Sequence, residues 1–275
     1  MTRWMARRSN GLIERVEELM RRAAAESILP RFRALLEGDV KEKSFGDFVT
    51  AADRDAETLL TSGLASLVPG SSVLGEEAAT AQPDLLGRLW DEDRLWLVDP
   101  LDGTANFIAG DPCFAVMVAL LERGHAVAGW ILDPVGDVMA VAETEGGAFL
   151  GDRRITVRAD APPSGALRGA VLTRFLPPEV RDRVEARRDR FGAMLPGLRC
   201  AGREYPAVAC GEEHFAVFWR TDPWDHAAGA LFVTEAGGHV ARLDGAAYRP
   251  MDGRSGLLVA HNAEIWRTVE RCLAD

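Results

Sequence analysis

Cysteines are few in this 275-residue sequence, and it contains no long hydrophobic run. Its four cysteines are widely spaced and form no C-x-x-C pair, which argues against a dense disulfide framework and favours free thiols in a reducing cytoplasm. No stretch approaches the ~20 apolar residues of a transmembrane helix, and no apolar signal core follows the basic residues 1–10. We therefore expect a cytoplasmic protein without a membrane partner.

Excess positive charge is also absent. The formal net charge is -10 at pH 7, so a broad surface for nucleic acid or for an anionic membrane is not expected. An acidic protein still binds an anionic phosphate where divalent metal ions lie between the two. Hydrophobic residues make up 47% of the chain, which fits a folded protein with a sizeable core.

Several well-known catalytic motifs are missing. The sequence contains no P-loop, no G-x-S-x-G nucleophile motif and no H-E-x-x-H zinc motif. The five histidines are scattered along the chain, which favours core or surface roles over metal ligation. Catalysis by those motifs is therefore not predicted.

The predicted elements indicate an α/β (α+β) protein in two parts. Residues 10–36 have helical spacing, with Pro30 breaking the helix, and residues 50–67 predict a second helix after a charged loop at 41–46. Apolar runs then predict strands at 72–74 and 95–98 and an antiparallel meander at 114–121, 126–132, 137–142 and 147–150. Further strands at 171–175, 198–200, 215–219, 238–241 and 256–260 alternate with helices at 178–191, 205–210, 224–236 and 263–273. The Pro- and Gly-rich segment 161–165 is the predicted boundary between an N-terminal α+β part, residues 1–160, and a C-terminal α/β part, residues 161–275.

The stretch at residues 95–104 combines a predicted buried strand with two carboxylates. An Asp-Pro step at Asp99 ends the strand, since proline cannot donate to a ladder, and Asp102 follows three residues later. Gly103 permits a close backbone approach, and Thr104 adds a hydroxyl beside the acids. Two aspartates on a rigid turn suit a hard cation and a polarised water. Asp-Pro and Asp-Gly are also ordinary turn dipeptides, so the metal interpretation needs further ligands.

Further acids lie where other elements begin. Asp53 lies three residues after Thr50 and matches the acidic member of a helix capping box. Glu76 follows Gly75 at the end of a predicted strand, and Asp225 lies in the first turn of a predicted helix, where a carboxylate also suits the helix dipole. Each of these acids therefore has a structural explanation as well as a functional one.

Together these motifs resemble those of the inositol monophosphatase family of metal-dependent phosphatases. The matching stretches are Asp47-Phe48-Val49-Thr50-Ala51-Ala52-Asp53, Gly75-Glu76-Glu77, Asp99-Pro100-Leu101-Asp102-Gly103-Thr104, Trp224-Asp225-His226-Ala227-Ala228-Gly229 and Thr234-Glu235-Ala236-Gly237-Gly238. The resemblance covers nearly the whole chain and implies a layered αβαβα fold, usually assembled as a homodimer. The implied reaction is hydrolysis of a small phosphate monoester by a metal-activated water, without a phosphoenzyme.

The resemblance also implies a magnesium site of two or three ions. Glu76, Asp99 and the backbone carbonyl of Leu101 would bind one Mg²⁺, and a third, weaker ion would lie near Glu76. Asp99 would bridge to a second Mg²⁺ that is also held by Asp102 and Asp225. These oxygen donors are the ligands that Mg²⁺ prefers.

The same resemblance assigns catalytic and phosphate-binding groups. Thr104 and Asp53, together with Glu76, would orient and deprotonate the attacking water. Backbone N–H groups of Gly103 and Thr104 would hold phosphate oxygens, and Asp225 would also contact the substrate.

The substrate end departs from the family pattern. Phe218 takes the place of an acid that binds ring hydroxyls in the inositol-phosphate hydrolases, and phenylalanine cannot accept a hydrogen bond from a hydroxyl. Arg203, which follows Gly202, would bind a second phosphate or carboxylate, or else form an ordinary salt bridge with a neighbour. Lys43 is a further candidate for substrate binding, or else a solvated charge. Histidinol phosphate, fructose 1,6-bisphosphate and a 3′-phosphorylated nucleotide are therefore alternatives to inositol monophosphate.

Two classes of function are compatible with these residues. The first is a Mg²⁺-dependent phosphomonoesterase acting on a small phosphorylated metabolite. The second is a non-catalytic metal- or phosphate-binding regulatory protein that keeps the fold. The presence of every implied ligand acid, together with Thr104 and Asp53, favours the enzyme.

Overall fold

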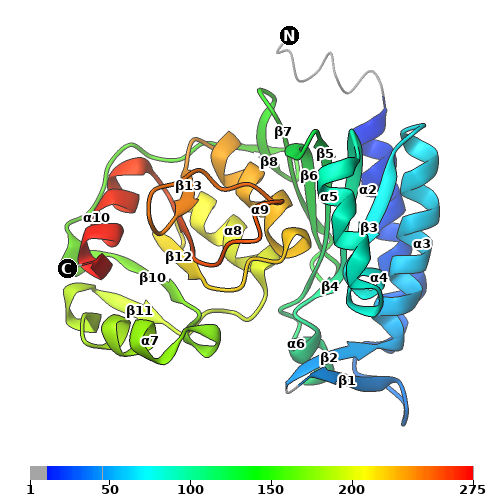
Figure 1. The fold of residues 1–275 in the computed structure, drawn as a ribbon, viewed down its shortest axis with the longest axis horizontal. Coiled ribbons are helices and arrows are strands. Elements are labelled where there is room, and N and C mark those ends of the chain that lie inside the picture. Colours follow the sequence, from blue (N-terminus) through cyan, green and yellow to red (C-terminus); the bar gives the residue numbers. More distant parts are fainter. Residues whose placement is uncertain (1–10, 45, 275) are drawn as a thin grey trace.

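The computed structural model describes residues 11–44 and 46–274, which form alternating layers of helix and sheet (Figure 1). α2 (Leu12–Ala23) and α3 (Ala51–Leu67) cover one face of a seven-stranded sheet. α8 (Ala201–Cys210) and α9 (Pro223–Glu235) lie between this sheet and a five-stranded sheet, whose far face packs against α10 (Ala263–Ala274). This order of layers confirms the predicted αβαβα arrangement.

The seven-stranded sheet contains the predicted meander. Its strands follow chain order from β3 to β9, with β3 and β4 parallel and every later neighbouring pair antiparallel. They are β3 (Ser72–Gly75), β4 (Arg94–Asp102), β5 (Ala115–Glu122), β6 (His125–Asp133), β7 (Val138–Glu143), β8 (Gly147–Leu150) and β9 (Arg153–Ile155). Residues 95–101 of β4 are all buried, because helices cover both faces of the sheet.

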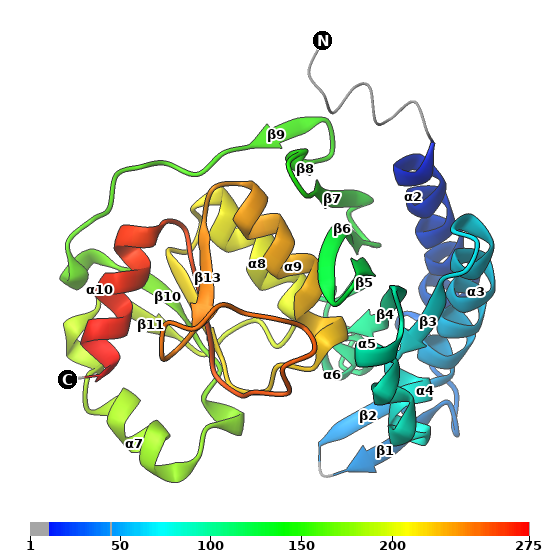
Figure 2. The same ribbon diagram turned by 45° about the horizontal axis from the view of Figure 1, so that its top comes forward.

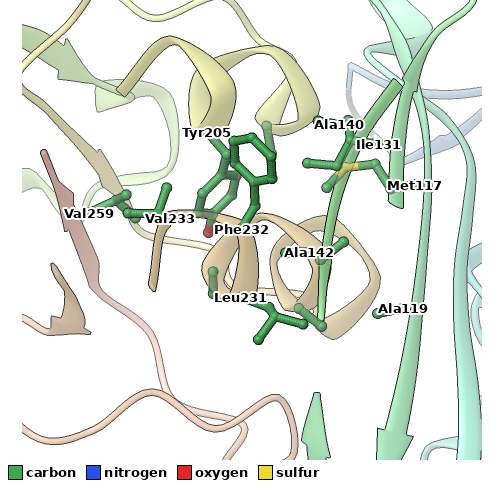
Figure 3. Packing of buried hydrophobic residues seen from close by; sticks show 14 of the residues in the cluster. Met117, Ala119, Ile131, Ala140, Ala142, Tyr205, Leu231, Phe232, Val233 and Val259 are labelled. Atoms are coloured by element: carbon green, nitrogen blue, oxygen red, sulfur yellow. The ribbon is translucent and has the colours of Figure 1, made fainter. Parts of the chain in front are cut away.

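Small residues let α9 lie close to this sheet. Ala119 and Ala142 of the sheet belong to the same buried cluster as Phe232 of α9 (Figure 3). A Cβ atom at Gly129 of β6 would lie 2.8 Å from the Cα atom of Ala228, so the approach of the two backbones needs glycine at this position. The N-terminal end of α9 and the carboxyl end of β4 line one cavity, through Asp225 and Asp102.

The N-terminal helix ends earlier than the sequence predicts. After α2 the chain forms a π-helix over Ala24–Ile28 and a 3₁₀ turn over Leu29–Arg31, so helical structure stops at Arg31 rather than at residue 36. Pro30 lies in this last turn, where its missing N–H and fixed φ favour the end of the helix. The predicted start at residue 10 lies outside the described residues.

A β-hairpin replaces the charged loop expected at residues 41–46. β1 (Val40–Ser44) pairs antiparallel with β2 (Asp47–Thr50), and the hairpin leads directly into α3. The predicted capping box at the start of α3 is confirmed, because the Thr50 side chain accepts a backbone hydrogen bond and Asp53 accepts one from the Thr50 N–H.

The five-stranded sheet has both parallel and antiparallel neighbours. Its order is β11-β10-β12-β14-β13, with β10 parallel to β11 and β12, and with β14 antiparallel to β12 and β13. The strands are β10 (Arg168–Val171), β11 (Ala193–Leu195), β12 (Phe215–Phe218), β13 (His239–Arg242) and β14 (Leu257–Ala260). The strand predicted at 198–200 is wrong, since Gly197 and Arg199 have left-handed backbones with φ of 82° and 57°.

The remaining helices are short. α4 (Glu76–Ala81), α5 (Arg88–Asp91) and α6 (Thr104–Ile108) belong to the part of the chain that forms the seven-stranded sheet, and α7 (Pro178–Glu185) follows β10. Single 3₁₀ turns lie at Pro83–Gly87, Ser164–Ala166, Thr173–Phe175 and Arg188–Arg190. Within residues 11–44 and 46–274, no helix is both long enough and apolar enough to cross a membrane.

Residues 156–167 connect one sheet to the other (Figure 2). This connection contains the Pro- and Gly-rich stretch at which we place the boundary between the two parts. Each predicted part therefore contains one of the two main sheets, and their independence as domains stays a prediction.

Candidate active site

The carboxyl end of β4 meets the starts of α4 and α9 at one cavity. This cavity has a volume of about 330 Å³, which is the size of a small-molecule site. Among the residues that line it are Glu76, Asp99, Leu101, Asp102, Gly103, Thr104 and Asp225. The fold thus brings together side chains from the ends of several helices and strands that are far apart in the sequence.

The turn that follows β4 depends on glycine. Gly103 has a φ of 88°, and a Cβ atom there would lie 3.0 Å from the Cys113 carbonyl oxygen and 3.2 Å from the Cys200 Cβ. The Gly103 carbonyl accepts a hydrogen bond from the N–H of Asn106 at 2.8 Å, which begins α6. The chain therefore changes from strand to helix between Asp102 and Thr104, and both side chains line the cavity.

Burial and neighbouring negative charges raise the pKa values of three carboxylates at the floor of this cavity, those of Asp99, Asp102 and Asp225. Asp99 is only 2% exposed. Burial raises the pKa of Asp99 well above its usual range, and the negative charges of Glu76, Asp102 and Asp225 raise it further. The pKa of Asp225 is raised well above its usual range by burial and by the charges of Glu76 and Asp102. A bound cation would relieve this mutual repulsion.

Asp102 also contacts the start of α8. Its Oδ2 atom accepts hydrogen bonds from the Gly202 N–H at 2.6 Å and from the Cys200 thiol at 3.2 Å. Burial raises the pKa of Asp102 to about 6, although these hydrogen bonds partly oppose the rise. A residue of the seven-stranded sheet is thereby connected to one of the two central helices.

Thr104 contacts the buried start of α3. Its hydroxyl lies 3.1 Å from Asp53 Oδ1 and 2.9 Å from the Leu101 carbonyl oxygen, and either can accept its proton. The other oxygen of Asp53 accepts hydrogen bonds from the Thr50 hydroxyl at 2.5 Å and from the Thr50 N–H at 2.8 Å. Burial raises the pKa of Asp53 to about 6. The cap of α3 therefore fixes the carboxylate that faces the Thr104 hydroxyl.

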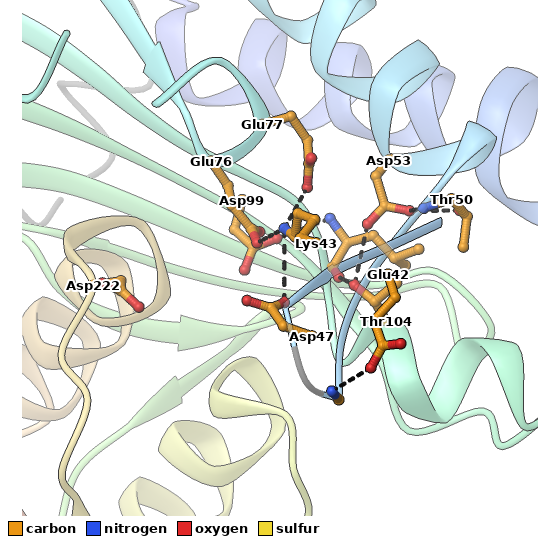
Figure 4. Close-up of polar contacts among 12 residues, drawn as sticks. Glu42, Lys43, Asp47, Thr50, Asp53, Glu76, Glu77, Asp99, Thr104 and Asp222 are labelled. Carbon is orange, nitrogen blue, oxygen red and sulfur yellow. Dashed lines mark hydrogen bonds and ion pairs between the residues drawn. The ribbon is translucent and has the colours of Figure 1, made fainter. Parts of the chain in front are cut away.

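Lys43 of β1 is an ion-pair partner rather than a solvated charge. Its Nζ atom lies 2.7 Å from Glu76 Oε1, 3.0 Å from Glu77 Oε1 and 3.8 Å from Asp47 Oδ1 (Figure 4). Burial lowers the pKa of Lys43, but the two glutamates outweigh this effect and raise the pKa above its usual range. A positive charge of the protein thus contacts a predicted metal ligand.

The donor atoms at this site fit a divalent cation by chemical type. In residues 11–44 and 46–274, no group of three or more His, Cys, Asp or Glu side chains is arranged to hold a metal ion as the side chains stand. Glu76 and Asp102 each direct an oxygen to a protein donor instead, namely Lys43 and the Gly202 N–H. The clustered carboxylates and the Leu101 carbonyl nevertheless form an all-oxygen donor set, which is the set that Mg²⁺ prefers.

Arg203 and Phe218 take different positions relative to the cavity. Arg203 forms an ion pair with Asp133 beside a second cavity of about 170 Å³, so the structure favours the salt-bridge alternative for this residue. Phe218 does line the larger cavity, and its ring stacks on that of Tyr205 with the centroids 5.4 Å apart.

Three arginines that line the larger cavity were not predicted from the sequence. They are Arg174, Arg199 and Arg220. Each follows the end of a strand by a few residues, which is a usable sequence signal in α/β proteins. The strands predicted at 171–175 and 198–200 concealed that signal, because they covered Arg174 and Arg199.

A small-molecule cavity with clustered acids and an oriented hydroxyl, in an αβαβα fold, indicates a phosphomonoesterase. The model of the inositol monophosphatase family matches residues 12–274, and the chain belongs to that family.

Proteins from several bacteria are similar to this chain. The inositol-1-monophosphatase of Mesorhizobium japonicum is 35% identical over 235 residues, which cover 81% of this chain and 82% of that protein. The Nus factor SuhB of Pseudomonas aeruginosa is 35% identical over 232 residues, covering 82% of this chain and 83% of that protein. The solved structure of the SuhB protein of Bartonella henselae has a TM-score of 0.80 and 28% identity, and it covers 94% of this chain and 98% of that one.

Proposed function

We propose that this protein hydrolyses a small phosphate monoester in a Mg²⁺-dependent reaction. The observation that supports the proposal most directly is the cluster of Glu76, Asp99, Asp102 and Asp225 in one cavity with Thr104. Divalent ions held by such oxygens attract a phosphate into an acidic site and lower the pKa of a bound water. Membership of the family and the relatives named inositol-1-monophosphatase support the same reaction.

Two overlapping groups of ligands would hold the metal. Glu76, Asp99 and the Leu101 carbonyl would bind one Mg²⁺, and Asp99, Asp102 and Asp225 would bind a second. A third, weaker ion would lie near Glu76. These assignments make Asp99 the shared ligand, in keeping with its burial and its raised pKa.

The protein's own groups would orient the reactants. The Thr104 hydroxyl, with Asp53 Oδ1 at 3.1 Å as its acceptor, would orient the attacking water and pass a proton toward that carboxylate. Backbone N–H groups of Gly103 and Thr104 would hold phosphate oxygens. Lys43 and Asp225 would contact the bound ester, with Lys43 leaving Glu76 to do so. A pKa of about 6 lets Asp53 accept a proton near neutral pH.

Phosphate release by the purified protein, with Mg²⁺ and with a chelator, tests the proposal. The panel should contain inositol 1-phosphate, histidinol phosphate, fructose 1,6-bisphosphate, a 3′-phosphorylated nucleotide and glycerol 2-phosphate. We expect Mg²⁺ to raise turnover of at least one ester by about 100-fold or more, since bound metal ions stabilise the charge of the transition state by several kcal/mol. Turnover that the chelator leaves unchanged would refute metal dependence.

Neighbouring glutamates supply a matched control. Glu76 and Glu77 both pair with Lys43, but only Glu76 lines the cavity. Glu76→Gln should lower Mg²⁺-dependent turnover by about 100-fold or more, whereas Glu77→Gln should lower it less than about fivefold. Equal losses in the two variants would show that the effect comes from the ion pair and not from metal binding.

The second class of function remains a distinct outcome of this assay. Some relatives carry the name Nus factor SuhB. A non-catalytic, regulatory role is the alternative to the phosphatase reaction. A folded protein that binds Mg²⁺ in calorimetry but releases phosphate from no ester would favour that alternative.

We also propose that the protein acts in the cytoplasm as a homodimer. The four cysteines are free thiols, as expected in a reducing compartment. Light scattering of the purified protein should give twice the mass of one chain, and the mass of a single chain would refute the dimer.

A further inference from the structure

Three neighbouring parallel strands of the five-stranded sheet each lead to an arginine at the cavity. β11, β10 and β12 lie side by side and run parallel, and Arg199, Arg174 and Arg220 follow their respective carboxyl ends. All three arginines line the cavity whose floor holds the carboxylates. Ligands of α/β proteins commonly bind at the carboxyl ends of parallel strands. This wall of the cavity therefore carries three guanidinium groups in a protein whose net charge is -10.

Arg199 is the arginine of this wall that remains available to a ligand. Within the described part of the chain, its side chain has no ion-pair or hydrogen-bond partner, and it is exposed at the cavity. Its backbone has a φ of 57°, which is uncommon for a residue with a side chain. Backbone conformations of this kind are concentrated at ligand-binding sites.

Arg174 and Arg220 flank an exposed aromatic ring. The guanidinium carbons of the two arginines lie 5.1 Å and 5.0 Å from the centroid of Phe175, which is 40% exposed. Arg220 is partly neutralised, since it lies 2.8 Å from Asp222 and 3.9 Å from Asp47. Arg174 donates a hydrogen bond to the Gly46 carbonyl at 3.0 Å, which connects the wall to the β1–β2 turn.

The surface between the arginines is mainly apolar. Leu172, Phe175, Phe218 and Trp219 line the cavity there, with Thr173 among them. Guanidinium groups donate hydrogen bonds and accept none. The Asp47 carboxylate also lines the cavity, but it already lies near Arg220 and Lys43. Apart from it, the side chains named here offer a sugar or polyol group few acceptors, whereas a phosphate or carboxylate would find strong donors.

We propose that this wall binds a second anionic group of the substrate, so that the natural ester carries a phosphate or carboxylate on its leaving group. The inference rests on the proposed function, because it specifies the ester that the same cavity hydrolyses. Arg199 is the principal contact, and Arg174 lies beside the same group. This assignment replaces the one made from the sequence for Arg203, which pairs with Asp133 at the other cavity.

Matched ligand pairs test the second anion site. Phenyl phosphate and 4-carboxyphenyl phosphate differ only in one carboxylate, and benzylphosphonate and 4-carboxybenzylphosphonate provide the same comparison without hydrolysis. We expect kcat/KM in the first pair, and affinity measured by calorimetry with Mg²⁺ in the second, to favour the carboxylated member by about 10- to 100-fold. The affinities are informative whether or not either ester is hydrolysed.

Two substitutions separate the effect of losing a guanidinium charge from the effect of placing glycine at a left-handed position. Arg199→Gly and Arg123→Gly each remove a guanidinium from a left-handed residue that glycine suits, and Arg123, with φ 48°, lies outside the cavity. We expect Arg199→Gly to abolish the preference for the carboxylated ligands and to change kcat/KM or affinity for the ligands without the carboxylate less than about threefold, as for a contact made only to the second anion. Arg123→Gly should preserve the preference.

Failure of this inference is distinct from failure of the proposed function. Equal affinity of the wild-type protein for the two phosphonates, or an equal loss for both in Arg199→Gly, would overturn the second anion site. A higher kcat/KM for inositol 1-phosphate than for every carboxylated or bisphosphorylated ester would overturn it as well. Absence of Mg²⁺-dependent hydrolysis of all esters would instead overturn the proposed function, while the phosphonate affinities would still decide the anion site.

Discussion

The Thr104 hydroxyl has one proton and two acceptors within reach. Asp53 Oδ1 lies 3.1 Å away and the Leu101 carbonyl oxygen 2.9 Å away. A hydroxyl that donates to either of them presents its lone pairs to the cavity, where they can accept a hydrogen bond from a water. A single side chain thus connects the cap of α3 with the place at which the ester would be attacked.

Replacing this hydroxyl by a methyl group should impair catalysis and leave the fold intact. Thr104→Val keeps the shape of the side chain, so the melting temperature should change little, while kcat should fall by about 100-fold or more, as for loss of a general acid–base group. Thr104→Ser restores the hydroxyl and should recover kcat to within about tenfold of the wild type. Steady-state kinetics with the best ester measure both effects. Unchanged kcat in Thr104→Val would show that another group orients the water.

Residues whose positions depend on local chain geometry were predictable. The Thr50–Asp53 cap and the close backbone approach at Gly103 follow from residues adjacent in the sequence, and the structure confirms both. The predicted end of the strand at the Asp-Pro step is wrong, since β4 continues to Asp102. The salt bridge between Arg203 and Asp133 and the contact of Lys43 with Glu76 join segments far apart in the chain. Such long-range pairs leave no trace in local spacing.

At the scale of elements, the contact between α8 and α9 fixes the position of Asp225. Gly229 of α9 lies against the ring of Tyr205 on α8, and a Cβ atom at Gly229 would lie 2.1 Å from Tyr205 Cδ2. Tyr205 is fully buried, and its hydroxyl lies 2.8 Å from the Nδ1 atom of His226, which follows Asp225. The two helices therefore cannot separate locally without moving the first turn of α9.

Gly229→Ala should destabilise the protein although alanine is the better helix former. The added methyl would overlap the Tyr205 ring, which should lower the free energy of unfolding by about 2 kcal/mol, as for an overpacked core. In a helix free of that contact the same change would stabilise by about 1 kcal/mol. Thermal or denaturant unfolding measures the difference, and calorimetry should show weaker Mg²⁺ binding because Asp225 moves.

Gly165→Ala is the control for this substitution. A Cβ atom at Gly165 would meet no atom within 4 Å, so stability and Mg²⁺ affinity should both stay close to those of the wild type. A gain in stability in Gly229→Ala would show that the ring of Tyr205 moves aside easily and that α8 does not hold α9 in place.

Element prediction succeeded where an apolar pattern extends over many residues. It failed where residues with a positive φ determine the path of the chain. The meander of β5 to β8 and the helices α3 and α9 have unbroken apolar patterns. Near β11 the strand was predicted at residues 198–200 instead of 193–195. Gly197 and Arg199 have left-handed backbones, and an apolar pattern does not predict such a backbone for an arginine. The same error concealed Arg199 as a cavity residue.

At the scale of the whole molecule, the layer order followed from the family resemblance and not from pattern. In the five-stranded sheet β10 lies between β11 and β12, and β14 lies between β12 and β13. Two of these neighbouring pairs, β10 with β12 and β12 with β14, are not consecutive in the chain, and their pairing depends on how α8 and α9 pack between the sheets. Local sequence therefore predicted the elements of this sheet better than their order.

The folded protein also contains several buried acidic side chains, and folding makes their ionisation less favourable. Folding raises the pKa values of Asp99 and Asp225 well above the usual range and that of Glu204 to about 8, in each case chiefly through burial. An acid with a raised pKa stabilises the folded state below its unfolded pKa and loses this contribution as the pH rises through the folded value. The metal-free protein should therefore lose stability between pH 7 and pH 8.5, a range in which unfolded histidines are already largely neutral.

Mg²⁺ should reverse most of that loss. Metal ions bind the ionised carboxylates, so stabilisation by Mg²⁺ should be larger at pH 8.5 than at pH 7. At a concentration 100 times the dissociation constant, one bound ion contributes about 2.7 kcal/mol, or about 5 °C in melting temperature for a chain of this length. Melting temperatures at the two pH values, with Mg²⁺ and with a chelator, measure the effect.

Asp225→Asn and Asp222→Asn locate the source of this stabilisation. Both residues lie at the start of α9, but only Asp225 lines the cavity with Asp99 and Asp102. We expect Asp225→Asn to abolish most of the Mg²⁺-dependent shift and Asp222→Asn to retain it. A shift of equal size in both variants, or one that does not grow with pH, would mean that Mg²⁺ stabilises the protein at a place other than this carboxylate cluster.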